Sequence, residues 1–315
     1  MISSIPGLNP SFTRYATTDS GANMLKAMCL ANEVSGSLKC IDHIFNTCVN
    51  KALEKSSLME VIGLCKNLAS LTHRSSLSQQ KIRKACESVA VTYRKIVQPV
   101  QTRWNSLYAC LVSIIAMKAP LLFVRENDEG TDLAKTIPDE FGFCKLEQII
   151  RPLEDIRKAS EALSAEDKPT IHLVLCYMMT LNNLQSKYGG LGKETMELCR
   201  VFVENLNQRV PNKGKNEYVQ TDIQREMRTY IENTPRAESV EVDILQWWKN
   251  KERDFPCLAK YVRQILAIPA TSAPSERVFS CGGNIMTAQR YQLSSQNLEM
   301  LIYIKQNFDK VLIAK

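Results

Sequence analysis

A run of basic side chains beside a tryptophan is the part of the sequence best suited to binding nucleic acid. Residues 80–105 contain one acid, Glu87, and six basic residues, Lys81, Arg83, Lys84, Arg94, Lys95 and Arg103. Lysine and arginine bind phosphate groups, and Trp104 is suited to stacking on a base. Residues 126–167 reverse the balance, with twelve acids and five bases, so only the first stretch suits a phosphate backbone. Solvated helix faces and a core tryptophan are the alternative interpretations.

Asp19, Cys40, His43 and Glu276 belong to the residue types that serve in catalytic and metal sites. Asp19 precedes a helical pattern, where a carboxylate is also suited to capping. Glu276 lies in the first turn of an expected helix, where the helix dipole favours an acid without any metal. Cys40 and His43 supply two ligands, fewer than the four of a structural zinc site, and no zinc-finger spacing occurs. We therefore expect a structural Cys–His pair on a helix face, unless DNA lies nearby.

The elements that must position these residues are predicted to be mostly helical. Residues 12–18 are β-branched and aromatic, which predicts a short strand, and a turn at 19–23 leads into a helix through Ala31. Apolar spacings of three and four predict a second helix from Leu38 to Ala52. The polar stretch 205–242 indicates a surface excursion or linker with one helix near 218–231. Further helices are expected over residues 81–96, 106–117, 146–163 and 171–188.

The last third of the chain is the most strongly patterned. Trp247 and Trp248 are expected in one helix, where adjacent residues cannot both face the same interior direction. A helix over 258–267 follows, and Ser272 is the expected N-cap of a short helix that ends at Gly282-Gly283. Ser294 is the expected cap of the final helix, with Leu293 and Leu298 forming a hydrophobic staple. One face of that helix carries Leu298, Leu301, Ile302 and Phe308.

Composition excludes several protein classes. The 315 residues are 44% hydrophobic and 23% charged, with a net charge of +7, which is ordinary for a globular protein. No apolar run reaches the roughly 20 residues that span a bilayer, and the first residues lack the pattern of a secretory signal. The eleven scattered cysteines form no Cys-x-x-Cys pair, a pattern typical of reduced thiols in an intracellular protein.

Several motifs in this order resemble hAT-superfamily DNA transposases, including their zinc finger BED-type and transposase-derived relatives. The C-terminal motifs are Trp247-Trp248, Phe255 to Ala259, Ile268 to Ser280, Gly283-Asn284, Arg290, Leu293 and Leu301 to Asn307. Three earlier stretches also match: Thr18 to Met24, Cys40-Ile41-Asp42-His43 with Asn46, and Thr102 to Ser106. The resemblance thus covers nearly the whole chain from about Phe12 onward.

The resemblance implies a mainly α fold with a small α/β remnant, an incomplete RNase H-like core interrupted by an all-helical insertion. It implies a partial core over residues 1–105, helical insertion and linker over 106–239, and a dimerisation domain over 240–315. Asp19 and Glu276 would be the second and last catalytic acids. Cys40 and His43 would lie in a helix beside the active site, and Trp104 would stabilise a flipped base. Together with the basic residues Lys81, Arg83, Lys84 and Arg103, which the charge pattern indicates, they are the candidate DNA-binding residues. The dimerisation residues would be Trp247, Trp248, Phe279, Leu298, Leu301 and Ile302.

The front of the sequence departs from the family pattern, because Met1 to Thr18 contain no acid to serve as the first catalytic aspartate. Two-metal cleavage needs carboxylates that clamp both metal ions. We therefore expect a catalytically incomplete protein without a cofactor. The resemblance implies a nuclear protein, and neither a membrane nor a small-molecule substrate is expected as a partner. It is expected to pair with a second copy or a related hAT-derived protein, and to contact DNA nonspecifically. The alternatives are an active transposase or nuclease that uses Mg²⁺, and a truncated product that folds poorly.

Overall fold

The computed structural model describes residues 15–19, 21–30, 36–54, 58–100, 104–209, 225–227, 229–230, 242–286 and 293–313. The chain divides into two compact units. Unit 1 comprises Met1–Asp42, Leu163–Ile171 and Asp222–Lys315, and unit 2 comprises His43–Ala162 and His172–Thr221. Each unit is described by itself.

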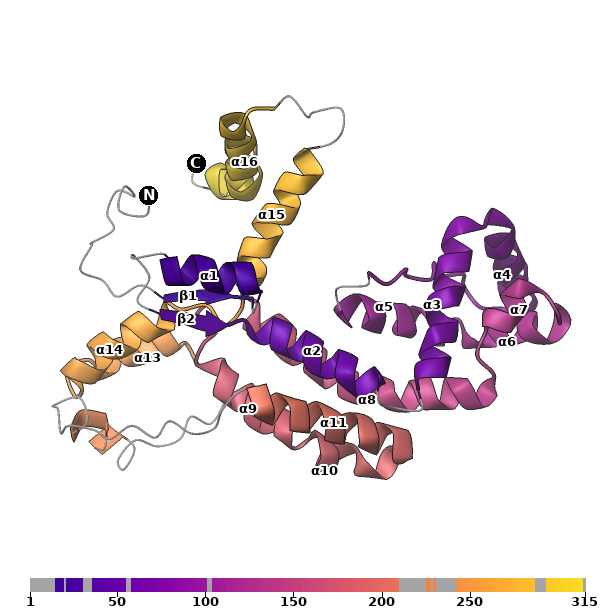
Figure 1. The fold of residues 1–315 in the computed structure, drawn as a ribbon, viewed down its shortest axis with the longest axis horizontal. Helices are drawn as coiled ribbons and strands as arrows, with labels where there is room; N and C mark the ends of the chain where they lie inside the picture. The colour runs from indigo at the N-terminus through magenta and orange to yellow at the C-terminus, as the bar shows by residue number, and fades with distance from the viewer. Residues whose placement is uncertain are drawn as a thin grey trace. The chain divides into compact units, whose positions relative to one another are not determined.

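Unit 1 contains a two-stranded parallel sheet, formed by β1 (Tyr15–Thr18) and β2 (Gly36–Lys39). Tyr15 pairs with Gly36 and Thr18 with Lys39. Parallel strands require a crossover connection, and α1 (Ala22–Leu30) lies within it, alongside the two strands (Figure 1). Because the strands run in the same direction, their carboxyl ends meet at one edge, where Asp19 and Cys40 follow them in the chain.

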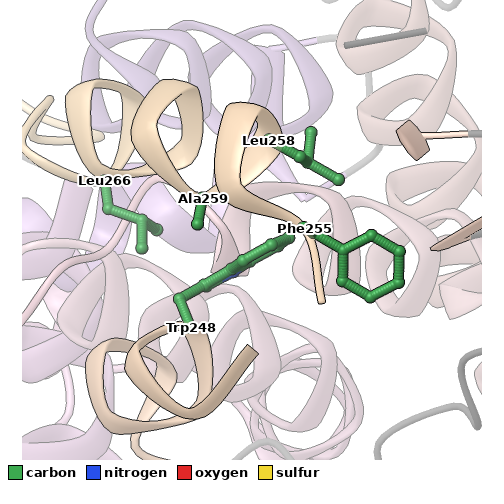
Figure 2. Packing of buried hydrophobic residues seen from close by; sticks show 5 residues of the cluster. All are labelled: Trp248, Phe255, Leu258, Ala259 and Leu266. Carbon is green, nitrogen blue, oxygen red and sulfur yellow. The ribbon is translucent and has the colours of Figure 1, made fainter. Parts of the chain in front are cut away.

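Four helices form the C-terminal part of unit 1: α13 (Ile244–Lys251), α14 (Pro256–Leu266), α15 (Ala273–Ile285) and α16 (Ser295–Ile313). A buried cluster joins α13 to α14. Figure 2 shows the ring of Trp248 reaching from α13 towards α14, near Ala259 and Leu266. Tyr230 and Trp247 pack against the same cluster, with the Tyr230 and Trp248 ring centroids 5.3 Å apart.

Unit 2 contains helices and no strand in its described residues. Most of α2 (Ile41–Glu54) belongs to it, followed by α3 (Met59–Arg74), α4 (Ser76–Ser88), α5 (Trp104–Ile115), α6 (Lys118–Asn127) and α7 (Asp132–Thr136). It continues through α8 (Glu140–Leu163), α9 (Leu173–Asn182), α10 (Leu184–Tyr188), η2 (Gly189–Leu191) and α11 (Lys193–Arg209). Phe45, Phe143 and Phe202 are among its largest fully buried side chains.

The expectation of a mainly α fold with a small α/β remnant is confirmed, whereas the RNase H-like arrangement of that remnant stays a prediction. Leu38 was expected in the second helix but lies in β2, and its helix begins at Ile41. The predicted helix over 81–96 ends at Ser88. The helix expected over 171–188 is divided between α9 and α10. Residues 12–14 of the predicted strand lie outside the described residues.

One prediction for the C-terminal third was wrong, and another was confirmed. Gly282 and Gly283 do not end α15, which continues to Ile285. A Cβ at Gly282 would lie 3.1 Å from Ile302 Cδ1 of α16, so this glycine permits close packing of the two helices. As expected for adjacent residues of one helix, Trp247 and Trp248 are not buried alike: Trp248 lies in the core cluster, whereas Trp247 is half-buried against it, with the two ring centroids 4.9 Å apart.

Among the described residues, no single helix is long and apolar enough to cross a membrane. The helices α5 and α6 reach the length and apolar composition of a membrane span only when taken together, and they are bent by 68° relative to each other.

Candidate functional site

Asp19 lies at the carboxyl edge of the sheet, directly after β1, and is partly exposed. Its Oδ1 accepts a hydrogen bond from the backbone N–H of Gly21 at 3.2 Å. Gly21 directly precedes α1, so the carboxylate fixes the turn into that helix. This contact stabilises the turn before α1, and the capping of α1 itself by Asp19 stays a prediction.

Cys40 follows β2 at the same edge and is 1% exposed. Its N–H donates to the Thr18 carbonyl at 2.8 Å, and its Sγ accepts from the Ser272 N–H at 3.2 Å. Two more contacts hold the segment before α15 at this edge. Thr17 Oγ1 donates to Pro269 O at 2.5 Å, and the Ile41 N–H donates to Ala270 O at 3.2 Å.

Glu276 lies in the first turn of α15 and is partly exposed. The Ser272 hydroxyl donates to Glu276 Oε1 at 2.8 Å. Ser272 was expected to cap the backbone of α15 with its side chain, but its hydroxyl binds this carboxylate instead, and Thr271 Oγ1 accepts from the Ala273 N–H. Cys40 Sγ and a Glu276 carboxylate oxygen lie within 4.8 Å.

A polar network behind this edge joins the three chain segments of unit 1. The Ser164 hydroxyl donates to Asp42 Oδ2 at 2.5 Å and accepts from Thr271 Oγ1 at 3.4 Å. Arg277 donates twice to the Ser164 carbonyl, at 3.2 Å each, and pairs with Glu166. The sequence offered no signal for Ser164, because Asp42 and Thr271 are more than 100 residues away from it in the chain.

In unit 2, Trp104 begins α5, and its backbone N–H donates to Asn46 Oδ1 at 3.0 Å. Its side chain is only 5% exposed, as the core interpretation expects. Trp104 contributes to the wall of a cavity of about 250 Å³, whose lining also includes Asn50, Lys66, Gln98, Pro99, Val100 and Leu107. His43 is half-buried in α2, and Arg103 lies outside the described residues.

The basic stretch is only partly available to phosphate. Lys81 forms an ion pair with Asp128, with 2.6 Å between Nζ and Oδ2, so an acid of the second charged stretch neutralises it. The Arg83 guanidinium lies over the ring of Tyr93, 4.1 Å from the centroid, and remains exposed. Lys84 is exposed as well.

Four buried thiols of unit 2 are unsuited to nucleophilic or redox chemistry. Burial raises the pKa of the Cys48 thiol to about 11, and the pKa values of Cys65, Cys110 and Cys199 to about 12. A thiol reacts as the thiolate. At neutral pH these four therefore remain protonated, inert core residues.

The predicted dimerisation residues divide into two groups. Trp248 is buried within its own unit, and Trp247 packs beside it. Leu298 and Ile302 are half-buried, and Ile302 lies against Gly282 of α15. Phe279 and Leu301 are exposed. Four further apolar residues of α16 are exposed as well, Met300, Tyr303, Ile304 and Phe308, of which only Phe308 belongs to the predicted apolar face.

Comparison with known families explains this organisation. Residues 226–308 match the hAT family C-terminal dimerisation region, and residues 38–140 match the ZBED1 RNase-like helical domain. The chain carries a hAT dimerisation region and a ZBED1-type helical domain. The first match begins at Glu226, whose carboxylate accepts from the backbone N–H groups of Cys257 and Leu258, at the start of α14.

Curated relatives agree with these matches. The chain is 34% identical over 80 residues to an AC transposase of Zea mays, which is 25% of this chain and 10% of that protein. It is 31% identical over 81 residues to the zinc finger BED domain-containing protein DAYSLEEPER of Arabidopsis thaliana, covering 26% of this chain and 12% of the relative. The matched stretch thus spans about a tenth of the length of each relative.

Proposed function

We propose that this transposase-derived protein self-associates through the outward face of α15 and α16. This outward face is defined by Phe279, Met300, Leu301, Tyr303, Ile304 and Phe308. The observation that carries the proposal is the distribution of apolar residues around α16. Ile302 packs against Gly282 of α15 and Leu298 is half-buried, while the five other large apolar residues named here from α16 are 39–67% exposed. A helix that is apolar all round needs cover on more than one side.

A second copy of the chain is the occupant that fits this face. Phe279 on α15 is 79% exposed, so the apolar surface extends over both helices. Monomers rarely expose a contiguous apolar patch larger than a few hundred Å², and burying one large apolar side chain gives about 1.5–3 kcal/mol. A two-fold pairing would bury the same six side chains from each chain. The matched dimerisation region supports this assignment, and a related hAT-derived protein is the alternative partner.

Light scattering on the purified chain tests the pairing. The wild type should have the mass of a dimer at micromolar concentration, and the Ile304→Glu/Phe308→Glu variant should be monomeric. Leu77→Glu is the matched control, because Leu77 is an equally exposed apolar residue on α4 of unit 2. A variant that dimerises as well as the control would overturn the proposal. A monomeric wild type that binds a related hAT protein would transfer the face to that partner.

DNA contact is the second part of the proposed function, and it would place the protein in the nucleus. The exposed basic residues Arg83, Lys84, Arg94 and Lys95 of unit 2 support contact with DNA phosphates. Phosphate contacts by themselves do not distinguish one DNA sequence from another. Gel shifts with DNA of random sequence test this, because affinity from phosphate contacts must fall as salt rises. Affinity that does not change with salt would contradict the proposal.

We further propose that the chain does not cleave DNA. Asp19 already binds the backbone that enters α1, and Glu276 accepts the Ser272 hydroxyl. The one group of possible metal ligands among the described residues contains a single carboxylate, that of Glu276, whereas two-metal cleavage uses several carboxylates. The competing function, suggested by the named transposase relative, is metal-dependent cleavage. Mg²⁺- or Mn²⁺-dependent nicking that is lost in both Asp19→Asn and Glu276→Gln would establish it and refute our proposal.

A further inference from the structure

Residues 92–100 of unit 2 form no helix or strand, yet the exposure of their side chains repeats every three residues. Tyr93, Ile96 and Pro99 are buried or half-buried, and the residues on both sides of each are exposed. Three residues per turn is the repeat of the polyproline II helix, whose backbone makes no internal hydrogen bonds. The partners of this backbone must therefore come from elsewhere.

Side chains of α5 and the residues that follow it supply these partners at the same interval. The N–H groups of Arg94, Val97 and Val100 donate to Met117 Sδ at 3.4 Å, to Ser113 Oγ at 3.0 Å and to Ser106 Oγ at 2.8 Å. The Ser106 hydroxyl also donates to the Val100 carbonyl at 3.0 Å. Ser106 and Ser113 are seven residues apart, so they lie on one face of α5.

The exposed side chains of the segment are suited to phosphate. Arg94 and Lys95 are both exposed. At the start of the segment, the guanidinium of Arg83, which is exposed as well, lies 4.1 Å from the centroid of the Tyr93 ring. In contrast, Lys81 is paired with Asp128.

We propose that residues 92–100 are a preformed phosphate-binding strip, which Ser106 and Ser113 hold in place as positioning residues. The proposal rests on the DNA contact proposed above and names the surface that makes it. Arg94 and Lys95 contact the phosphates of a DNA backbone. Because the two serines fix the segment before DNA arrives, binding does not have to order the backbone.

The first experiment measures how DNA affinity depends on salt. A short DNA duplex of random sequence is titrated with the full chain at several salt concentrations. Arg94→Ala/Lys95→Ala should weaken binding and lower the slope of log K against log salt by about 1.8, because each phosphate contact contributes about 0.9. Arg151→Ala/Lys193→Ala is the control, since it removes two exposed charges from helices α8 and α11 of the same unit. A slope that falls equally in both variants would overturn the strip.

The second experiment separates positioning from charge. Ser106→Ala/Ser113→Ala keeps every charge but removes the hydroxyl groups that hold the segment, and we expect roughly tenfold weaker binding from the lost preorganisation. Ser106→Thr, with Ser113 unchanged, keeps both hydroxyl groups and should retain most of the affinity that the double alanine variant loses. Ser88→Ala is the control, because the Ser88 hydroxyl binds only Lys84 O of its own helix in the described structure.

The outcomes distinguish this inference from the proposed function. If the wild type shows no salt-dependent binding, the DNA contact itself is wrong. If the wild type binds and the Arg94/Lys95 variant matches its control, the DNA contact stands and the strip is wrong. If Arg94→Ala/Lys95→Ala binds more weakly than its control but Ser106→Ala/Ser113→Ala binds like the wild type, the segment contacts DNA without needing the two serines. Circular dichroism melts of every variant exclude loss of folding as the cause of weaker binding.

Discussion

The hydroxyl of Ser164 should be one of the main polar supports of unit 1. Ser164→Ala removes the hydrogen bond to Asp42 Oδ2 at 2.5 Å and the contact from Thr271 Oγ1 at 3.4 Å. Losing a hydrogen bond to a charged group costs about 1.5–3 kcal/mol, and the longer contact adds little. Ser164 is buried, so water cannot replace its hydroxyl without rearrangement. We expect unit 1 to lose about 2 kcal/mol of unfolding free energy.

Urea unfolding followed by tryptophan fluorescence measures this loss. In a Trp104→Phe background, the two remaining tryptophans, Trp247 and Trp248, both report on unit 1. With an m-value of about 2 kcal/mol per molar urea, the midpoint should fall by roughly 1 M. Ser88→Ala should leave it unchanged, because Ser88 is exposed on α4 of unit 2. A Ser164→Ala midpoint equal to that of the control would refute the importance of this hydroxyl.

Three further predictions follow from other contacts. Gly283→Ala should stabilise α15 by up to about 1 kcal/mol, because a Cβ at this position meets open space. Gly282→Leu should instead destabilise the protein by about 1–3 kcal/mol, because its side chain would be overpacked against Ile302. Equal shifts of the melting temperature in the two variants would contradict the close approach of Gly282 to Ile302. Glu226→Ala should cost unit 1 about 1 kcal/mol, since it leaves the N–H groups of Cys257 and Leu258 at the start of α14 without their carboxylate, and an unchanged urea midpoint would argue against this cap. Burial raises the pKa values of the Cys65 and Cys110 thiols from 9.0 to about 12. Their contribution to stability is therefore fully present below pH 9 and is lost as the pH rises towards 12. Cys110→Ala should flatten the fall of the urea midpoint above pH 9, and an unaltered pH dependence would refute this.

Local patterns predicted several elements correctly because their causes are local. Apolar spacing placed Phe45, Cys48, Val49 and Ala52 on the buried face of α2, and all four are buried. The cap expected at Ser294 is present, since its Oγ accepts from the Asn297 N–H at 3.3 Å. Neither assignment needs information from another part of the chain.

The sequence failed where a distant segment decides the structure. Leu38 continues the apolar spacing of α2, yet it lies in β2 because Thr17 of β1 pairs with it. Residues 92–96 continue the composition of α4, but the N–H groups of Arg94 and Val97 bind Met117 and Ser113 instead of extending the helix. The two adjacent glycines of α15 predict a helix end, but α15 continues to Ile285. The signal was ambiguous, because Gly282 provides space for Ile302 rather than a turn.

The segment between α14 and α15 connects the acidic residues to the self-association surface within unit 1. Pro269, Ala270 and Ser272 all bind the β1–β2 edge through their backbone atoms, so these contacts depend little on their own side chains. Glu276 and Arg277 follow within the first turn of α15, and Arg277 binds the Ser164 carbonyl. The start of α15 is therefore held at the sheet edge, while its far end packs on α16 through Gly282. Within unit 1, α15 therefore runs from the acidic edge to the helix whose outward face we propose for self-association, and the position of its start is set by contacts within one chain.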